Sequence, residues 1–405
     1  MDKTQAEKLL SRRLWVDWLR LLALFMVVCS HCCDPFTANP DPIVSQDARL
    51  GFWGAIWQSA VRPCVPLFAC MTGLLLLPVK QEMGLFYRRR ISRVLWPFLI
   101  WSVLYCLFPV VVMGLGGTQE LVLRCFTSAG EPSSRLSDAL LNIVCIPFDF
   151  SAYSVHMWYV FLIIGLYLYL PIFSAWVEKA TMAQKHLVLG IWGVTLFLPY
   201  AECGTEQLFG VCAWNSFGML YYFAGFSGYM LLGHVVSQWK PMSFKNSLAV
   251  ALPLWLLGYA GTFVGYRFIQ TGAVSSGSSI AEMMQMALCP AQAGLPYEAS
   301  HELCLLYCSP NVALMVVGIL LVFRHFGTAS LRVRALLADM TACGFGIYLI
   351  HYLFVGPANM AAAALHIPLE VTVPVAAMLA FPASWLMVSL LRRLLPTSWS
   401  RCLLG

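Results

Sequence analysis

The chain has 405 residues, of which 60% are hydrophobic and only 11% are charged. Soluble domains carry about a quarter charged residues, so this composition excludes an ordinary soluble protein and predicts a polytopic membrane protein. The formal net charge of +6 does not indicate nucleic-acid binding, because the basic residues are distributed among loops instead of forming one patch. Many of the 15 Cys lie within apolar segments, where Cys acts as a small hydrophobe, and no CxxC pattern predicts structural zinc.

The first apolar segment, residues 15–34, is long enough to span a bilayer and contains Asp17, Arg20 and His31. At ~100° per residue these three side chains share one stripe of a single helix, roughly 20 Å long. Ionisable groups at membrane depth are costly and usually mark a functional site. We therefore expect a helix that lines a polar path and ends in an imidazole. The alternative is that Asp17 and Arg20, three residues apart, simply neutralise each other.

The remaining hydrophobic pattern predicts an all-α fold of ten transmembrane helices in a single domain, residues 1–405. The expected spans are 15–34, 57–78, 91–115, 154–177, 186–201, 215–237, 246–267, 310–326, 338–358 and 371–395. Most of the basic residues fall in alternate loops and most acids in the others, so the positive-inside bias places both termini in the cytoplasm. The charged N-terminus runs straight into the first span and does not resemble a cleavable signal peptide.

Two segments on the predicted outer side are long, residues 116–153 and 268–309. Each contains an apolar piece that is too short to span a bilayer, ALLNIVCIPF and IAEMMQMAL. We expect these pieces to form short helices that cap the outer face. If that compartment is oxidising, a Cys203–Cys212 disulfide and one bond among Cys289, Cys304 and Cys308 are expected. No metal site is predicted.

Several polar residues converge on the outer level where His31 is expected. Arg62 begins the second span, His156 begins the fourth, and His351 lies late in the ninth. Tyr348 is three residues before His351 and shares its helical face. These residues could line a common outer pocket, or the histidines could be ordinary interfacial or core groups of aromatic-rich helix ends.

On the inner side, FYRRRISRVLWP places Arg88, Arg89, Arg90 and Arg93 at the entry to the third span. Such arginines are typical positive-inside anchors. They could also form an anion site, because the planar guanidinium group suits phosphate recognition.

The order of these segments resembles the acyltransferase 3 family of membrane O-acyltransferases. Arg20 and His31 match its Arg-x10-His signature. The segments VPLFACMTGLLLLP, RRRISRVLWPFLIWS and HMWYVFLIIGLYLYLPIF match further family segments in order, as do YYFAGFSGYMLLGHVV, SPNVALMVVGILLVF and FGIYLIHYLF. One departure is Thr72-Gly73, where the family usually has Ser-Gly. The hydroxyl is kept, so we expect little change there.

The resemblance implies transfer of an acyl group, usually acetyl from cytoplasmic acetyl-CoA, to a hydroxyl or amine of an extracytoplasmic saccharide or cell-envelope acceptor. It implies a multi-pass protein of the cytoplasmic (plasma) membrane with acyl-CoA as co-substrate and no tightly bound cofactor. His31 would be a general base or, alternatively, a transient acyl carrier, and Arg20 would position the donor or stabilise developing charge. Asp17 is a third catalytic candidate.

The other candidates fall into two groups under this resemblance. Arg88, Arg89, Arg90 and Arg93 would bind the anionic donor, while Arg62, His156, Tyr348 and His351 would form the acceptor pocket. A transporter or flippase for a polar or lipid-linked solute is the alternative function, because a polar stripe through one helix suits it equally well. Against it, the sequence shows no repeated half with paired broken helices.

Overall fold

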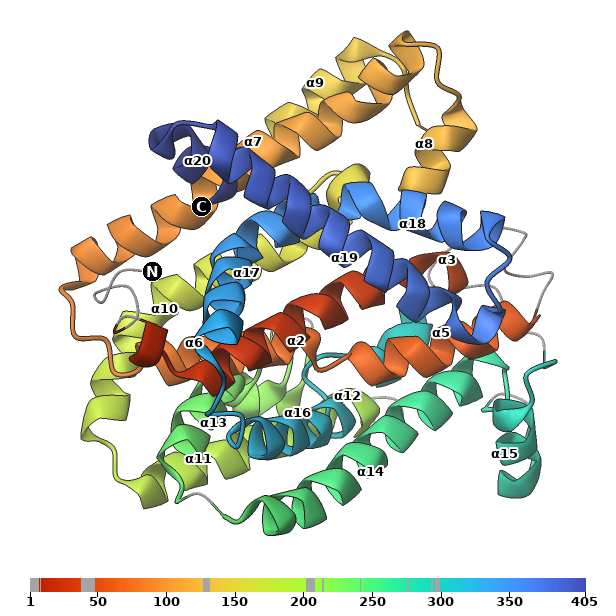
Figure 1. Cartoon of the computed structure of the whole chain (residues 1–405). Helices are drawn as coiled ribbons and strands as arrows, with labels where there is room; N and C mark the ends of the chain where they lie inside the picture. Colours follow the sequence, from red (N-terminus) through yellow and green to blue (C-terminus); the bar gives the residue numbers. More distant parts are fainter. Residues whose placement is uncertain are drawn as a thin grey trace. The chain divides into compact units, whose positions relative to one another are not determined.

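The computed structural model (Figure 1) describes residues 7, 9–37, 48–126, 132–201, 208–212, 215–240, 242–274, 277–292, 294–295 and 299–405. Over these ranges the chain consists of α-helices and short 3-10 helices, without a β-strand, which confirms the all-α prediction. This is the expected outcome for a chain in lipid, because a helix satisfies its backbone hydrogen bonds within one segment.

Eight helical segments of the described chain are long and apolar enough to cross a membrane, so the protein is a multi-pass membrane protein. They are α2 (Leu14–Cys32), α5 with α6 (Ala48–Val61 and Cys64–Leu76), α7 (Met83–Gly114), η1 with α10 (Ala152–Met157 and Trp158–Lys179), α14 (Phe244–Gln270), η4 with α16 (Ala299–Leu305 and Pro310–Phe323), α17 (Leu331–Ile350) and α19 (Leu369–Leu394).

The other two expected spans are divided into shorter helices. The region 186–201 contains α11 (Met182–Thr195) and α12 (Leu198–Ala201), where Pro199 cannot donate a ladder hydrogen bond. The region 215–237 contains η3 (Gly218–Phe223) and α13 (Ser227–Gln238), separated by Gly225 with a φ of 86°. None of the four approaches the ~20 residues of a straight span. The count of ten and the cytoplasmic termini therefore remain predictions.

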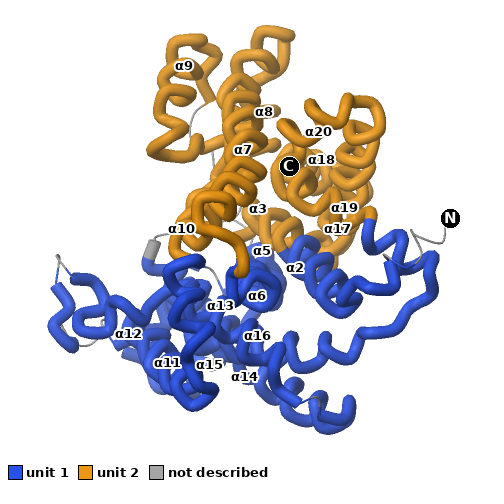
Figure 2. The backbone as a smooth tube through the Cα atoms, turned by 90° about the vertical axis from the view of Figure 1, so that its left-hand side faces the viewer, with its two compact units in different colours: residues 1–26, 45–79, 170–338 blue, residues 27–44, 80–169, 339–405 orange. Residues whose placement is uncertain are grey.

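The chain forms two compact units, which Figure 2 shows in separate colours. Unit 1 comprises residues 1–26, 45–79 and 170–338, and unit 2 comprises residues 27–44, 80–169 and 339–405. Helix α2 begins in unit 1 and ends in unit 2. The prediction of a single domain stays a prediction.

In unit 2 the long helix α7 is the scaffold for several shorter ones. It begins after Glu82, whose carboxylate accepts hydrogen bonds from the backbone N–H groups of Gly84 and Leu85, both at 2.8 Å. These bonds lower the pKa of Glu82 from its ordinary value, as expected for an acid at a helix N-terminus. Helices α9 (Leu136–Cys145) and α20 (Thr397–Leu404) pack against α7, and Trp101 donates to the carbonyl of Leu403 at 2.9 Å. Helices α8 (Gln119–Cys125) and α18 (Tyr352–Ala364) pack on each other.

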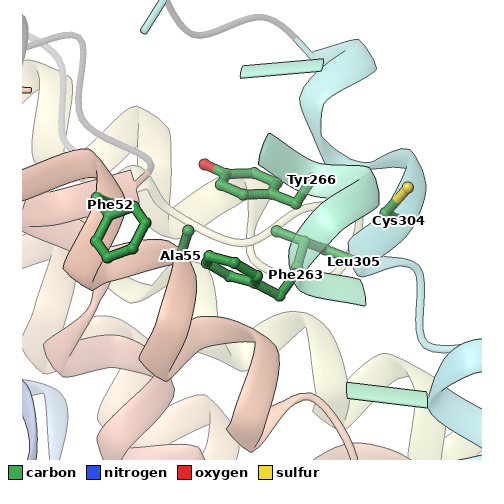
Figure 3. Close-up of a cluster of buried hydrophobic side chains, with 6 residues drawn as sticks. All are labelled: Phe52, Ala55, Phe263, Tyr266, Cys304 and Leu305. Atoms are coloured by element: carbon green, nitrogen blue, oxygen red, sulfur yellow. The ribbon is translucent and has the colours of Figure 1, made fainter. Parts of the chain in front are cut away.

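Unit 1 has an apolar core where α5, α14 and η4 meet (Figure 3). Its members are Phe52, Ala55, Phe263, Tyr266, Cys304 and Leu305. The Phe52 and Phe263 rings make an edge-to-face contact at 5.7 Å between centroids. Cys304 is buried in this cluster, and the disulfide expected among Cys289, Cys304 and Cys308 is not formed. Cys212 is free, and Cys203 lies outside the described residues.

A fully buried cation in unit 1 holds the backbone at residues 287–289. Arg267 of α14 donates from Nε to the carbonyl of Ala287 (3.1 Å) and from Nη2 to that of Cys289 (3.0 Å). Its Nη1 donates to Gln270 Oε1 at 2.8 Å, and its guanidinium lies over the Phe52 ring. The two carbonyls belong to the C-terminal end of α15 (Ile280–Leu288), where carbonyls lack intrahelical partners and favour a cation. The short helices α9 and α15 form where the two apolar pieces predicted them.

The helices α6 and α13 of unit 1 cross at backbone contact. A Cβ atom at Gly73 would lie 1.9 Å from the carbonyl oxygen of Met230, and one at Gly233 would lie 2.0 Å from that of Cys70. Small residues at helix interfaces allow such close approach in membranes, where van der Waals packing contributes much of the association. The crossing therefore depends on glycine at both positions.

We predict that Gly73→Ala and Gly233→Ala will each lower the thermal stability of the detergent-solubilised protein. Each added methyl overlaps backbone instead of a flexible side-chain end, so the helices must separate, at a cost of about 1–3 kcal/mol. The matched control is Gly165→Ala in α10, where a Cβ meets nothing within 4 Å. Melting curves followed by intrinsic fluorescence measure the effect. Equal melting temperatures for Gly73→Ala and Gly165→Ala would contradict the prediction.

Candidate active site

His31 lies in the last turn of α2, just before the short helix α3 (Asp34–Thr37). Its Nδ1 is 3.0 Å from Oδ2 of Asp34. Both side chains are partly shielded, with exposed fractions of 18% and 14%. A carboxylate accepts a hydrogen bond, so Nδ1 carries the hydrogen and the neutral ring keeps a lone pair on Nε2. His31 therefore presents a basic nitrogen from a ring whose other nitrogen is fixed.

His351 lies at the junction between α17 and α18. Its Nδ1 is 2.7 Å from the carbonyl oxygen of Tyr348, one turn earlier in α17. Because a carbonyl only accepts, Nδ1 is again the protonated nitrogen. The opposite nitrogen, Nε2, is buried and has no hydrogen-bond partner among the described residues.

His156 belongs to η1, the 3-10 segment that precedes α10. Its Nε2 lies 3.4 Å from the carbonyl oxygen of Leu349, a long hydrogen bond that places the hydrogen on Nε2. Its Nδ1 is buried and, over the described ranges, has no hydrogen-bond partner. The Tyr348 hydroxyl donates to the backbone carbonyl of His156, which ties η1 to α17.

The three rings form one group within unit 2, which we call the histidine cluster (His31, His156 and His351). Their centroids are separated by 6.1 Å (His31–His156), 5.3 Å (His31–His351) and 5.1 Å (His156–His351). The Tyr352 ring contacts all three, at 5.2 Å from His31 and 4.9 Å from His156. Tyr105 of α7 packs on His156 at 5.3 Å and donates from its hydroxyl to Leu349 O at 2.8 Å. The described residues contain no His, Cys, Asp or Glu group arranged to hold a metal ion.

Three predicted site residues belong to unit 1, namely Asp17, Arg20 and Arg62. Asp17 forms a two-pronged ion pair with Arg12, with Nη2–Oδ1 at 2.6 Å and Nε–Oδ2 at 2.8 Å. Arg12, just before α2, is therefore a partner of Asp17, and a pairing of Asp17 with Arg20 stays a prediction. Arg20 is half-buried on the same helix as His31, about three turns earlier.

Arg62 lies at the junction of α5 and α6, and its side chain is buried. Its Nη1 donates to the Tyr307 hydroxyl at 3.3 Å, and its guanidinium stacks 4.8 Å from the centre of that ring. Tyr307 is held in turn by α13, because the Tyr229 hydroxyl donates to its carbonyl at 2.6 Å. Arg62 is thus held by Tyr307 within unit 1.

The four arginines of the FYRRRISRVLWP segment lie on α7, within its first three turns. Arg88, Arg89 and Arg93 are exposed and Arg90 is half-buried. None of the four pairs with a carboxylate of a described residue, and Arg93 Nη2 lies 3.4 Å from the carbonyl of Gly405. This cationic stretch and Tyr105 share one helix, with about 18 Å of rise between Arg93 and Tyr105.

Sequence reasoning missed three residues that contact the histidine cluster: Asp34, Tyr105 and Tyr352. Asp34 was detectable, because an acid three residues after a histidine lies close to it even at the end of a helix. Tyr352 follows His351 directly but looked like one more aromatic in an aromatic-rich span. No sequence pattern distinguishes Tyr105 from other aromatic residues, since its role depends on the packing of α7 against η1 and α17.

A family model described as an acyltransferase domain matches residues 13–391, nearly the whole chain. The chain belongs to the acyltransferase 3 family. The comparisons with curated proteins and with solved structures gave no match. As an acyltransferase 3 protein with multiple membrane-spanning helices, it is a membrane acyltransferase. Its family signature, Arg20 and His31, lies on α2, and the histidine cluster surrounds the C-terminal end of that helix.

We predict that Tyr348→Phe will loosen the histidine cluster of this acyltransferase. The change removes the hydroxyl that bonds the His156 carbonyl and leaves a buried acceptor without that donor. The expected loss is about 1–3 kcal/mol of unfolding free energy. Melting temperature is the measurement, and Tyr222→Phe, whose side chain is 86% exposed, is the matched control. A Tyr348→Phe protein as stable as the control would show that the bond contributes nothing.

Proposed function

We propose that this membrane acyltransferase moves an acetyl group from cytoplasmic acetyl-CoA to a hydroxyl of an extracytoplasmic saccharide or other envelope acceptor. The observation that carries the proposal is the His31–Asp34 contact, which leaves a basic Nε2 on the one ring of the histidine cluster that is partly exposed. His156 and His351 are buried, so His31 is the most exposed ring of the cluster.

In the proposed reaction His31 Nε2 removes the proton of the acceptor hydroxyl as its oxygen attacks the thioester carbonyl carbon. The new C–O bond forms, the tetrahedral intermediate collapses, and the C–S bond breaks. The proton on His31 then passes to the departing thiolate, which gives the acetyl ester and free CoA. General base catalysis of this kind contributes about 10²–10⁴-fold. Attack by the same Nε2 on the thioester would give an acyl-His31 intermediate, and both routes use the same atom.

The acceptor is proposed to bind beside the buried members of the cluster. His156 Nδ1 and His351 Nε2 have no partner among the described residues, and each can accept a hydrogen bond from a hydroxyl. Tyr348 supports this side of the cluster through its bond to η1. Arg62, stacked on Tyr307, is proposed as a further acceptor contact for a polar or anionic part of the saccharide.

The anionic donor is proposed to bind the arginines of α7. Arg88, Arg89, Arg90 and Arg93 supply positive charge that no described carboxylate neutralises, and guanidinium groups bind phosphate through paired donors. Helix α7 then continues to Tyr105, which touches His156. Arg20 is proposed to act along α2 as a second positive contact for the donor or for the developing oxyanion.

We predict that His31→Asn will abolish acyl transfer without unfolding the protein. The variant lacks the proton-accepting nitrogen, so the rate of transfer should fall by about 10²–10⁴-fold. The assay follows label from radiolabelled acetyl-CoA into envelope material in membranes that contain the protein. His186→Asn, an exposed position on α11, is the control and should keep wild-type activity.

Two outcomes of this assay would count against the proposal. Full activity of a folded His31→Asn protein would remove His31 from the chemistry. No transfer by the wild type, together with uptake of a polar solute into vesicles, would favour the transporter reading instead.

We also predict that replacing all four α7 arginines by glutamine will weaken donor binding more than turnover. Loss of several charge-assisted contacts should raise KM for acetyl-CoA by about tenfold or more and leave kcat within about twofold. Added salt should raise the wild-type KM and affect the variant less. The control is Arg124→Gln, which removes an exposed arginine paired with Glu120. A variant with unchanged KM would show that these arginines serve only as membrane anchors.

A further inference from the structure

We propose that Asp34 is the positioning residue of the catalytic base: its carboxylate holds His31 in the Nδ1–H form and pairs with the imidazolium that forms during acyl transfer. The inference rests on the proposed function, because it assigns Asp34 a role through His31. It goes beyond the Arg20–His31 signature, which does not include this residue.

A short turn of the chain holds Asp34 beside His31. His31 ends α2 and Asp34 begins α3, so three residues of chain fix the distance between the two side chains. The turn between them is itself well bonded, because the Cys33 N–H donates to the carbonyls of Cys29 and Ser30. The Thr37 hydroxyl donates back to Cys33 O at 3.1 Å, and Phe36 is buried. The carboxylate is therefore presented to Nδ1 by a rigid turn.

The other described groups around the His31 ring carry no negative charge. The groups that face His31 are the imidazoles of His156 and His351 and the ring of Tyr352, none of which is an anion at neutral pH. The nearby cysteines of this turn, Cys32 and Cys33, are buried thiols. Within the described ranges, Asp34 is the carboxylate that contacts a ring of the histidine cluster. A positive charge on His31 is therefore partnered by Asp34 among the described residues.

The three imidazoles differ in the kind of group that fixes the position of the ring hydrogen. Backbone carbonyls fix the hydrogen positions of His351 and His156, whereas a carboxylate fixes that of His31. A carbonyl dipole orients a ring, but a full negative charge also stabilises the protonated ring. The ring with the carboxylate is the partly exposed one, which is where a base that cycles between neutral and protonated forms is needed.

The test compares Asp34→Asn and Asp34→Glu with Asp149→Asn, an exposed aspartate outside the site. An amide at position 34 can donate as well as accept, so it no longer fixes the tautomer. We expect Asp34→Asn to lower kcat for transfer from labelled acetyl-CoA to envelope membranes by about 100-fold or more, with KM for acetyl-CoA within about twofold. Asp34→Glu should recover part of the loss, and Asp149→Asn should match the wild type.

A double variant separates positioning from a merely structural role. If Asp34 acts through His31, the His31→Asn/Asp34→Asn protein should be no slower than His31→Asn alone, within about twofold. An additional loss of about tenfold or more would overturn the inference while leaving His31 as the base. Activity of Asp34→Asn within about threefold of wild type would do the same. Full activity of His31→Asn would instead overturn the proposed function, and the inference with it.

A direct readout covers the case in which Asp34→Asn is too unstable to assay. Nitrogen NMR of histidine-labelled protein in detergent reports which ring nitrogen carries the hydrogen, with the His31 signals assigned by their loss in His31→Asn. We expect the Nδ1–H form in the wild type and in Asp34→Glu. An Nε2–H form of His31 in the wild type would overturn the inference.

Discussion

The arrangement of the histidine cluster depends on the open C-terminal end of α17. The last carbonyls of a helix have no intrahelical donor, and in lipid they must find one elsewhere. The Tyr348 carbonyl accepts from His351, and the Leu349 carbonyl accepts from both His156 and Tyr105. One helix end therefore orients two imidazoles and a phenol, and it does so because its backbone requires partners.

The third imidazole, that of His31, also lies at a helix end. His31 lies in the last turn of α2, where the chain turns into α3 and brings a carboxylate within reach. All three rings thus lie where regular helix stops. Interruptions of helices inside a membrane protein are tolerated where polar groups satisfy the freed backbone, and the three imidazoles and Asp34 lie at such helix ends. Helix α7 differs, because it carries both the four arginines and Tyr105 within one helix that contains Pro97 between them.

Much of the candidate site could be predicted from the sequence, because a polar residue in a hydrophobic run is conspicuous. His31, His156, Tyr348 and His351 each stood out in this way, and the structure describes all four in one unit. The Asp17–Arg12 pair lies at the N-terminal edge of α2, where helical periodicity no longer determines which side chains meet. Periodicity also could not reveal that the apolar regions 186–201 and 215–237 are divided by Pro199 and Gly225.

The fixed hydrogen positions have a consequence for which molecules the site can hold. In the neutral state each ring of the histidine cluster keeps one nitrogen as a lone-pair acceptor, and the bonds to Asp34, Tyr348 O and Leu349 O prevent a simple exchange of roles. A carboxylate or a fully ionised phosphate also offers only lone pairs, so it gains nothing there. A neutral polyol brings several hydroxyl hydrogens and can satisfy two or three acceptors at once. If an acceptor binds at these nitrogens as proposed, the cluster favours it by the number of hydrogens that it can donate, and competitive inhibitors should be sought among neutral polyhydroxylated compounds.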